Sequence, residues 1–155
     1  MGPPWTELCP ALIFSTSQFS MDGHPGSLET WENFAEWIGK LWEGRDELPD
    51  EVKARVNELK NKHGMSKELV HALYREVQKN TRYVSVQLGI GGFQTEFASV
   101  TARNRYGDCK ALSNYLMGML RHAGFEAYPA LIRNGPYSFP FDPEFVHDPF
   151  NHVVI

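Results

Sequence analysis

A helical repeat in the second half of the sequence constrains the fold more than any other feature. Between Asp108 and Gly124, apolar side chains recur at the spacing of one helix face, at Leu112, Tyr115, Leu116, Met119, Leu120 and Ala123. Gly124 is a typical residue just beyond a helix C-terminus, and Arg121 and His122 suit the last turn. The sequence therefore predicts a long amphipathic helix, whose apolar face has to pack against other elements.

Three further helices are predicted upstream of this one. The first places six apolar residues on one face, Trp31, Phe34, Ala35, Ile38, Leu41 and Trp42, with Ser27 as a plausible N-cap and Gly44 as a stop. The second covers residues 49–63, with Pro49 and acidic side chains in its first turn. Ser66 caps the third helix, which ends near residue 80.

From residue 81 onward, short runs of β-branched, aromatic and aliphatic residues predict strands. One strand over residues 83–88 leads into a glycine loop at 89–92. Residues 125–133 and 151–155 read as two further strands, separated by a loop rich in proline and aromatic residues at 134–149. Because the helices come first and most of the strands last, we predict an α+β fold.

The two ends of the chain predict a fragment of a longer protein. A length of 155 residues suits one domain. Residues 1–27 contain four prolines and no helical period, so we expect a linker or interdomain arm with a short strand at 11–15. The sequence stops on the apolar, strand-like run that ends at Ile155. We therefore expect residues 28–155 to form a domain that is incomplete at its C-terminus.

Composition excludes several classes of function. The chain is 42% hydrophobic and 22% charged, has a net charge of -4, and contains no run of Lys or Arg. This balance argues against nucleic acid and anionic membranes as partners. No apolar stretch approaches the ~20 residues that span a bilayer. Two cysteines, Cys9 and Cys109, cannot form a disulfide framework or a structural zinc site alone. We predict no metal, no cofactor and no membrane insertion, and the sequence leaves the oligomeric state open.

Cys109 is the residue with the clearest potential for chemistry. It lies at the start of the predicted long helix, where free backbone N–H groups and the positive end of the helix dipole favour a thiolate. Positive charge on Arg103, Arg105 and Lys110 acts in the same direction, and the Asp108 carboxylate opposes it. The alternative is a small buried core residue that follows an ordinary N-cap.

A thiol nucleophile needs a base, and His152 is the best candidate. It stands between Phe150 and a run of aliphatic residues, so it should begin a buried strand. An imidazole on such a strand can face a helix N-terminus, as in Cys–His catalysis. The alternative is a hydrogen-bonded core histidine. His147 is the second candidate, but its spacing from His152 gives no reason for the two to converge with Cys109 on zinc.

Five short motifs follow one another along the chain: Arg82-Tyr83-Val84, the glycine loop at 89–92, Asn104-Arg105-Tyr106-Gly107-Asp108-Cys109-Lys110, Gly124-Phe125-Glu126-Ala127-Tyr128 and Phe150-Asn151-His152-Val153. In this order they resemble the bacterial transglutaminase-like domain, in the superfamily of papain-like cysteine proteases and transglutaminases. The upstream helices resemble the leader of large bacterial members, so the resemblance covers about residues 28–155. It implies a helical N-terminal part followed by a core of one helix and an antiparallel sheet, truncated at its C-terminal strands.

The resemblance also implies roles for individual residues. Cys109 would be the nucleophile and His152 the general base and acid. In the family an Asp usually lies on the strand after the histidine, whereas Asp142, Glu144 and Asp148 all precede it here. Either this acidic residue follows the end of the present sequence, or this member lacks one. Without it the tautomer of the histidine is not fixed, and activity should fall by orders of magnitude.

The sequence offers several candidates for the hydrogen-bond donors to an oxyanion and does not choose between them. The backbone N–H of Cys109 at the helix start is one candidate, and the side chains of Gln87 and Tyr83 on the preceding predicted strand are others. The glycine loop at 89–92 lacks the ending of a phosphate-binding loop, so we interpret it as a turn at the rim of a cleft.

Two hypotheses follow. In the first, the Cys109 thiolate attacks a carboxamide or peptide carbonyl, His152 protonates the leaving amine, and the acyl-enzyme passes to water or to an amine. In the second, a catalytically inactive module binds a peptide or cell-envelope partner in the same cleft. The resemblance implies a peptide or protein substrate and an exported or envelope-associated location in bacteria, and it does not choose between peptidase, amidase and transglutaminase.

Overall fold

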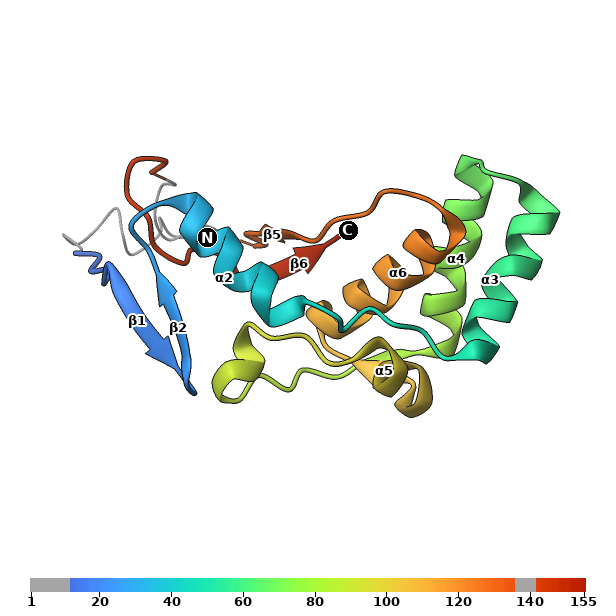
Figure 1. Ribbon diagram of the computed structural model, residues 1–155, viewed down its shortest axis with the longest axis horizontal. Helices are drawn as coiled ribbons and strands as arrows, with labels where there is room; N and C mark the ends of the chain where they lie inside the picture. Colours follow the sequence, from blue (N-terminus) through green and yellow to red (C-terminus); the bar gives the residue numbers. More distant parts are fainter. Residues whose placement is uncertain (1–11, 136–141) are drawn as a thin grey trace, which may run out of the picture.

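The computed structural model describes residues 12–135 and 142–155, and Cys9 lies outside them. It combines α-helices with small sheets, which confirms the α+β class. The helix α6 (Cys109–Ala123) runs through the middle of the molecule (Figure 1). It contacts α3 (Asp50–His63), α4 (Lys67–Asn80), α5 (Ala98–Asn104) and the strand β6 (His152–Val154). The helix with the most buried residues among those described is thus the central one.

All four helices predicted from apolar spacing are present with nearly the predicted bounds, including α2 (Trp31–Trp42). Ser66 caps α4, where its Oγ accepts a hydrogen bond from the Leu69 N–H at 3.3 Å. The predicted cap of α2 is wrong. Thr30 occupies that place, and its Oγ1 accepts from the Asn33 N–H at 3.1 Å. The short helix α5 was not predicted, because only Ala98 and Thr101 of its seven residues are buried and they form no apolar stripe.

The strands are shorter than predicted. The strand β3 (Arg82–Tyr83) covers only the start of the run at 83–88. It pairs in parallel with β4 (Tyr106–Gly107), and the ladder ends there because α6 begins two residues later. Residues 84–88 therefore continue as a chain without a strand partner, and residues 89–92 form the 3₁₀ turn η1 (Gly89–Gly92).

The two C-terminal strands form an antiparallel pair beside α6. The strand β5 (Ala130–Ile132) is only part of the predicted run at 125–133, and Leu131 pairs with Val153 of β6. Val153 is buried against the core, and its carbonyl oxygen accepts a hydrogen bond from the Ser113 Oγ of α6 at 3.3 Å. The start of β6 is therefore held near the N-terminal half of α6.

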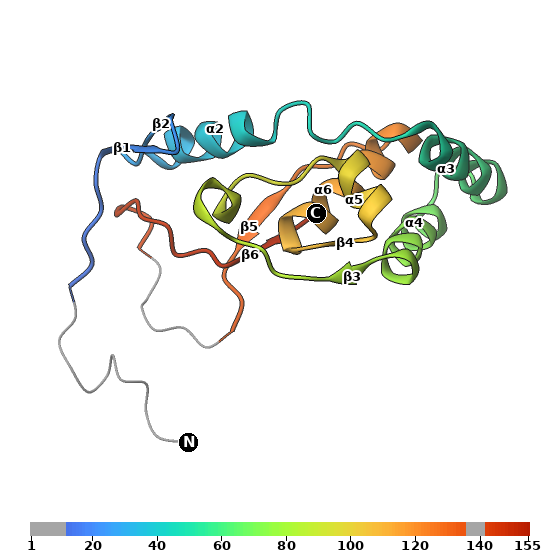
Figure 2. The same cartoon turned by 90° about the horizontal axis from the view of Figure 1, so that it is seen from below.

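Part of the predicted linker is folded. Residues 12–15 form no strand, contrary to the prediction for 11–15, and residue 11 lies outside the described part of the chain. Instead, β1 (Gln18–Met21) and β2 (His24–Ser27) form an antiparallel hairpin beside α2 (Figure 2). Its turn residues Asp22 and Gly23 both have positive φ, 48° and 83°, as a tight hairpin turn requires. Among the described residues, no helix is long and apolar enough to cross a bilayer.

Candidate functional site

Cys109 is the first residue of α6 and is buried. The preceding residue, Asp108, caps the helix, since its Oδ1 accepts a hydrogen bond from the Ala111 N–H at 3.0 Å. Glycine at position 107 allows the chain to turn tightly into α6, because a Cβ at that position would lie 2.6 Å from the Cβ of Ala111. The sulfur is thus held at the positive end of a helix of 15 residues.

The charges around Cys109 are arranged differently from the sequence-based expectation. The Lys110 Nζ lies 2.5 Å from the Asp108 Oδ2, and both side chains are buried, so the two opposite charges compensate each other. Arg103 and Arg105 are exposed, and neither lines the pocket around the thiol. Of the charges next to Cys109 in the sequence, the Asp108–Lys110 pair is thus internally compensated, whereas the N-terminus of α6 still favours a thiolate.

Cys109 and His152 line the same pocket, which has a volume of about 260 Å³. Apolar side chains supply much of its wall: Ile38, Phe93, Leu131, Phe150 and Val153. Gln87, Lys110, Asp148 and Asn151 are the other polar side chains that line it. The pocket is thus assembled from the N-terminus of α6, the β5–β6 pair and segments of α2 and η1.

The two histidine candidates occupy different environments. His152 opens β6, is half-buried, and its ring makes no hydrogen bond to any other described residue. His147 does not line the pocket. Its Nδ1 is 3.0 Å from the Phe145 carbonyl oxygen, and its ring packs beside Trp31 and Phe145. Among the described residues, no three His, Cys, Asp or Glu side chains gather as a metal site would require.

The two predicted side-chain donors both approach the thiol region. Gln87 lines the pocket with Cys109, from the unpaired segment that follows β3. Desolvation raises the pKa of the Tyr83 hydroxyl, as do negative charge on Cys109 and Asp108 and a hydrogen bond with the Cys109 side chain. A hydrogen bond from the Cys109 backbone acts in the opposite direction. A tyrosine hydroxyl is already protonated at neutral pH at its ordinary pKa, and a pKa shifted upward leaves it a hydrogen-bond donor.

Asp148 is a pocket residue that sequence reasoning did not assign. It lies at the exposed rim of the pocket, and its Oδ1 accepts a hydrogen bond from the Phe150 N–H at 3.1 Å. Surrounding protein desolvates the carboxyl and raises its pKa, an effect opposed by that hydrogen bond and by the charge of His147. Asp148 lies in an irregular loop, so neither helical nor strand periodicity could have predicted its place.

Comparison with protein-family models, with curated proteins and with solved structures finds no significant match to this chain.

Proposed function

We propose that the chain carries a thiol-dependent acyl-transfer site of the transglutaminase-like, papain-like class, with Cys109 as nucleophile and His152 as general base and acid. The observation that carries the proposal is the shared pocket, in which a cysteine at a helix N-terminus and a histidine at the start of a strand both line one apolar cavity. The finer fold assignment, a papain-like or transglutaminase-like core, is part of the same proposal. The packing of β6 on α6 supports it.

The proposed reaction proceeds in two steps. His152 accepts the proton of the Cys109 thiol, and the sulfur attacks the carbonyl carbon of a carboxamide or peptide to form a tetrahedral intermediate. When this intermediate collapses, the carbon–nitrogen bond breaks, and the imidazolium gives its proton to the leaving amine. The resulting thioester is then attacked by water or by a second amine, with His152 again accepting the proton of the attacking group. The carbon–sulfur bond then breaks to release the acyl product, and the imidazolium returns its proton to the Cys109 sulfur.

Two side chains are suited to stabilise the oxyanion of the intermediate. Tyr83 is a neutral hydroxyl beside Cys109, and Gln87 carries an amide group into the pocket. Both can donate a hydrogen bond to the developing negative charge, and in a partly apolar cavity such a bond is stronger than in water.

The second candidate is a catalytically inactive module that binds a peptide in the same pocket. The observation that favours it is the imidazole of His152, which has no hydrogen-bonded carboxylate among the described residues to fix its tautomer.

Thiol reactivity distinguishes the two candidates. In a Cys9→Ser background Cys109 is the only thiol, and its rate of alkylation by iodoacetamide can be measured from pH 5 to 9. The catalytic proposal expects alkylation at pH 6 about tenfold faster than that of an unstructured cysteine, and a loss of this advantage in His152→Ala. His71→Ala, a histidine on α4 outside the pocket, is the control and should leave the rate unchanged. An ordinary rate that does not respond to His152→Ala would favour the binding module.

A further inference from the structure

The segment from Val84 to Leu88 has backbone groups without partners. The Val84 N–H donates to the Gly107 carbonyl oxygen at 2.9 Å, which is the last contact with the β4 chain. Beyond it, the backbone groups of Ser85, Val86 and Gln87 form no hydrogen bond with any other described residue. Exposed, unpaired N–H and C=O groups along an extended chain are a template for another strand.

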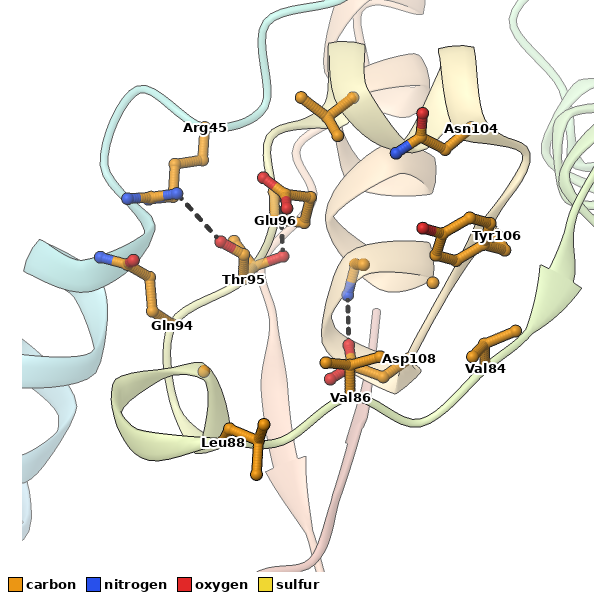
Figure 3. Close-up of a pocket in the computed structure, with 14 residues that line it drawn as sticks. Arg45, Val84, Val86, Leu88, Gln94, Thr95, Glu96, Asn104, Tyr106 and Asp108 are labelled. Atoms are coloured by element: carbon orange, nitrogen blue, oxygen red, sulfur yellow. Dashed lines mark hydrogen bonds between the residues drawn. The ribbon is translucent and has the colours of Figure 1, made fainter.

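The side chains of this segment alternate between two cavities. Val84, Val86 and Leu88 line a second pocket, which has a volume of about 300 Å³ (Figure 3). Gln87 points to the other side of the segment and lines the pocket of Cys109. Tyr83, four residues earlier and therefore on the same side as Gln87, interacts with Cys109. Alternation with a period of two is the property of an extended strand. The segment therefore forms a wall between the two pockets.

The face toward the second pocket is apolar and open to solvent. The exposed fractions of Val84, Val86 and Leu88 are 37%, 58% and 85%. The polar residues Thr95, Glu96, Asn104 and Asp108 also line this cavity (Figure 3). An occupant must therefore combine apolar side chains with hydrogen-bonding groups.

We propose that residues 84–88 bind an extended polypeptide as an added β-strand. This proposal rests on the proposed function, because the polypeptide is the substrate of the Cys109 site. The occupant is defined by complementarity. The free edge presents N–H donors and C=O acceptors in alternation. The backbone of an extended polypeptide has the same spacing and places an acceptor opposite each donor and a donor opposite each acceptor. Gln87 makes the surface continuous with the Cys109 pocket.

The pairing fixes where the side chains of the bound peptide lie. Neighbouring residues on paired strands share the same face of the sheet. Every second side chain of the peptide therefore packs on Val84, Val86 and Leu88, and the intervening ones point to the side of Cys109. The structure thus favours a substrate with apolar residues on both sides of the residue that reaches the thiol.

Binding can be tested apart from chemistry in the full chain with Cys109→Ala. The probe is a fluorescein-labelled peptide, Thr-Val-Gln-Val-Lys-Val-Thr, whose valines alternate with polar residues, and binding is read by fluorescence polarisation. We expect saturable binding that Val86→Asp weakens at least about tenfold. Tyr74→Asp is the matched control, an exposed apolar residue on α4, and should leave the affinity unchanged. Circular dichroism confirms that both variants are folded.

Two peptide controls test the backbone pairing itself. Only alternate N–H groups of a strand point to one neighbour, so methylating the amides of one parity should abolish binding and methylating the other should preserve it. Absence of saturable binding up to about 1 mM peptide would overturn the proposal. Equal affinity for both methylated peptides, or for Val86→Asp and its parent, would do the same.

A second copy of the chain is the competing occupant. If the protein self-associates and Val86→Asp makes it monomeric, the edge pairs with the same edge of a second copy, and the peptide proposal fails.

Because the Cys109→Ala chain lacks the proposed nucleophile, these binding results are independent of the alkylation experiment. In the Cys9→Ser chain, bound peptide should also slow the alkylation of Cys109, and an unchanged rate would contradict the assigned orientation.

Discussion

Gly118 lies where α6 passes close to the connection between α2 and α3. A Cβ at this position would collide with the Asp46 carbonyl oxygen and lie 3.1 Å from the Leu48 Cδ2. The neighbouring contact between Arg121 Nη1 and Asp46 Oδ2, 2.7 Å apart, holds the same connection against the helix. Glycine at residue 118 therefore permits the close approach of a backbone to the central helix.

Replacing Gly118 by Ala should lower the free energy of unfolding by about 1–3 kcal/mol, because the colliding atom belongs to backbone and cannot turn aside. Gly39→Ala is the matched control. Gly39 is exposed in α2, and nothing lies within 4 Å of the Cβ that it would carry. Here the better helix former should raise stability by about 0.5–1 kcal/mol. Urea unfolding measures both free energies. If the two substitutions changed stability equally, the close approach at Gly118 would not be what constrains this position.

The raised pKa of Asp148 predicts a second effect at the residue scale. Because desolvation raises this pKa in the folded state, the native protein binds this proton more tightly than the unfolded chain. The contribution of Asp148 to stability should therefore fall as pH rises through the raised pKa. Asp148→Asn removes this dependence, so the free energy of unfolding of the variant, relative to that of the unmodified chain, should increase with pH. Unfolding measured at intervals from about pH 4 to 8 tests the sign, and parallel profiles would contradict it.

At the scale of elements, α3 and α4 are joined by one polar bridge. Arg55 Nη2 lies 2.8 Å from Glu76 Oε1 on the other helix, and Arg55 Nη1 lies 2.7 Å from Glu58 Oε2 on its own. The hydrogen bond with Arg55 lowers the pKa of Glu76. The side chain of Glu76 is 19% exposed and that of Glu58 is 68% exposed, so water screens the two pairs unequally.

Glu76→Gln should therefore destabilise the protein by about 1 kcal/mol, and Glu58→Gln by about 0.3 kcal/mol or less. The lowered pKa of Glu76 gives a stabilising contribution that is complete above its unfolded value and disappears as pH falls through the folded one. The difference between the two variants should thus shrink below about pH 4. Thermal unfolding at neutral and acid pH provides the measurement, and an equal loss in both variants at neutral pH would refute the assignment to the bridge between helices.

Local signals decided which elements could be predicted. The helices α3, α4 and α6 combine an apolar stripe with a residue that starts or ends them, such as Ser66, Asp108 or Gly124, and their bounds followed from the sequence. The run at 83–88 has strand composition, but its ladder depends on β4, which is far along the chain and only two residues long. The hairpin β1–β2 was missed although Asp22-Gly23 is a hairpin signal, because the prolines around it indicated a linker.

The same distinction holds for the site. Cys109 and His152 were candidates because each begins an element, and the fold brings both to one pocket. The pairing of Lys110 with Asp108 and the place of Asp148 depend on side-chain positions in three dimensions, which no spacing in the sequence encodes.

At the scale of the whole molecule, aromatic rings connect the N-terminal hairpin to the candidate site. The ring of Phe19 on β1 meets Trp37 edge-on at 4.8 Å, and Trp37 stacks on Phe34 at 6.2 Å. Phe34 in turn stacks on Phe150, which lines the pocket of Cys109 and His152. The hairpin and α3–α4 lie at opposite ends of the molecule (Figure 1). The hairpin is thus packed on the aromatic side of the core, beside the elements that carry the site.

If this contact is part of the cooperative fold, Phe19→Ala should lower the free energy of unfolding by about 1–3 kcal/mol, since it removes a partly buried ring and an aromatic pair. Tryptophan fluorescence and far-ultraviolet circular dichroism should then shift to the same new midpoint. Phe14→Ala is the control, because 87% of Phe14 is exposed and its removal should change stability by less than about 0.5 kcal/mol. If Phe19→Ala behaves like Phe14→Ala, the hairpin folds independently, and residues 18–27 belong with the linker that the sequence predicted.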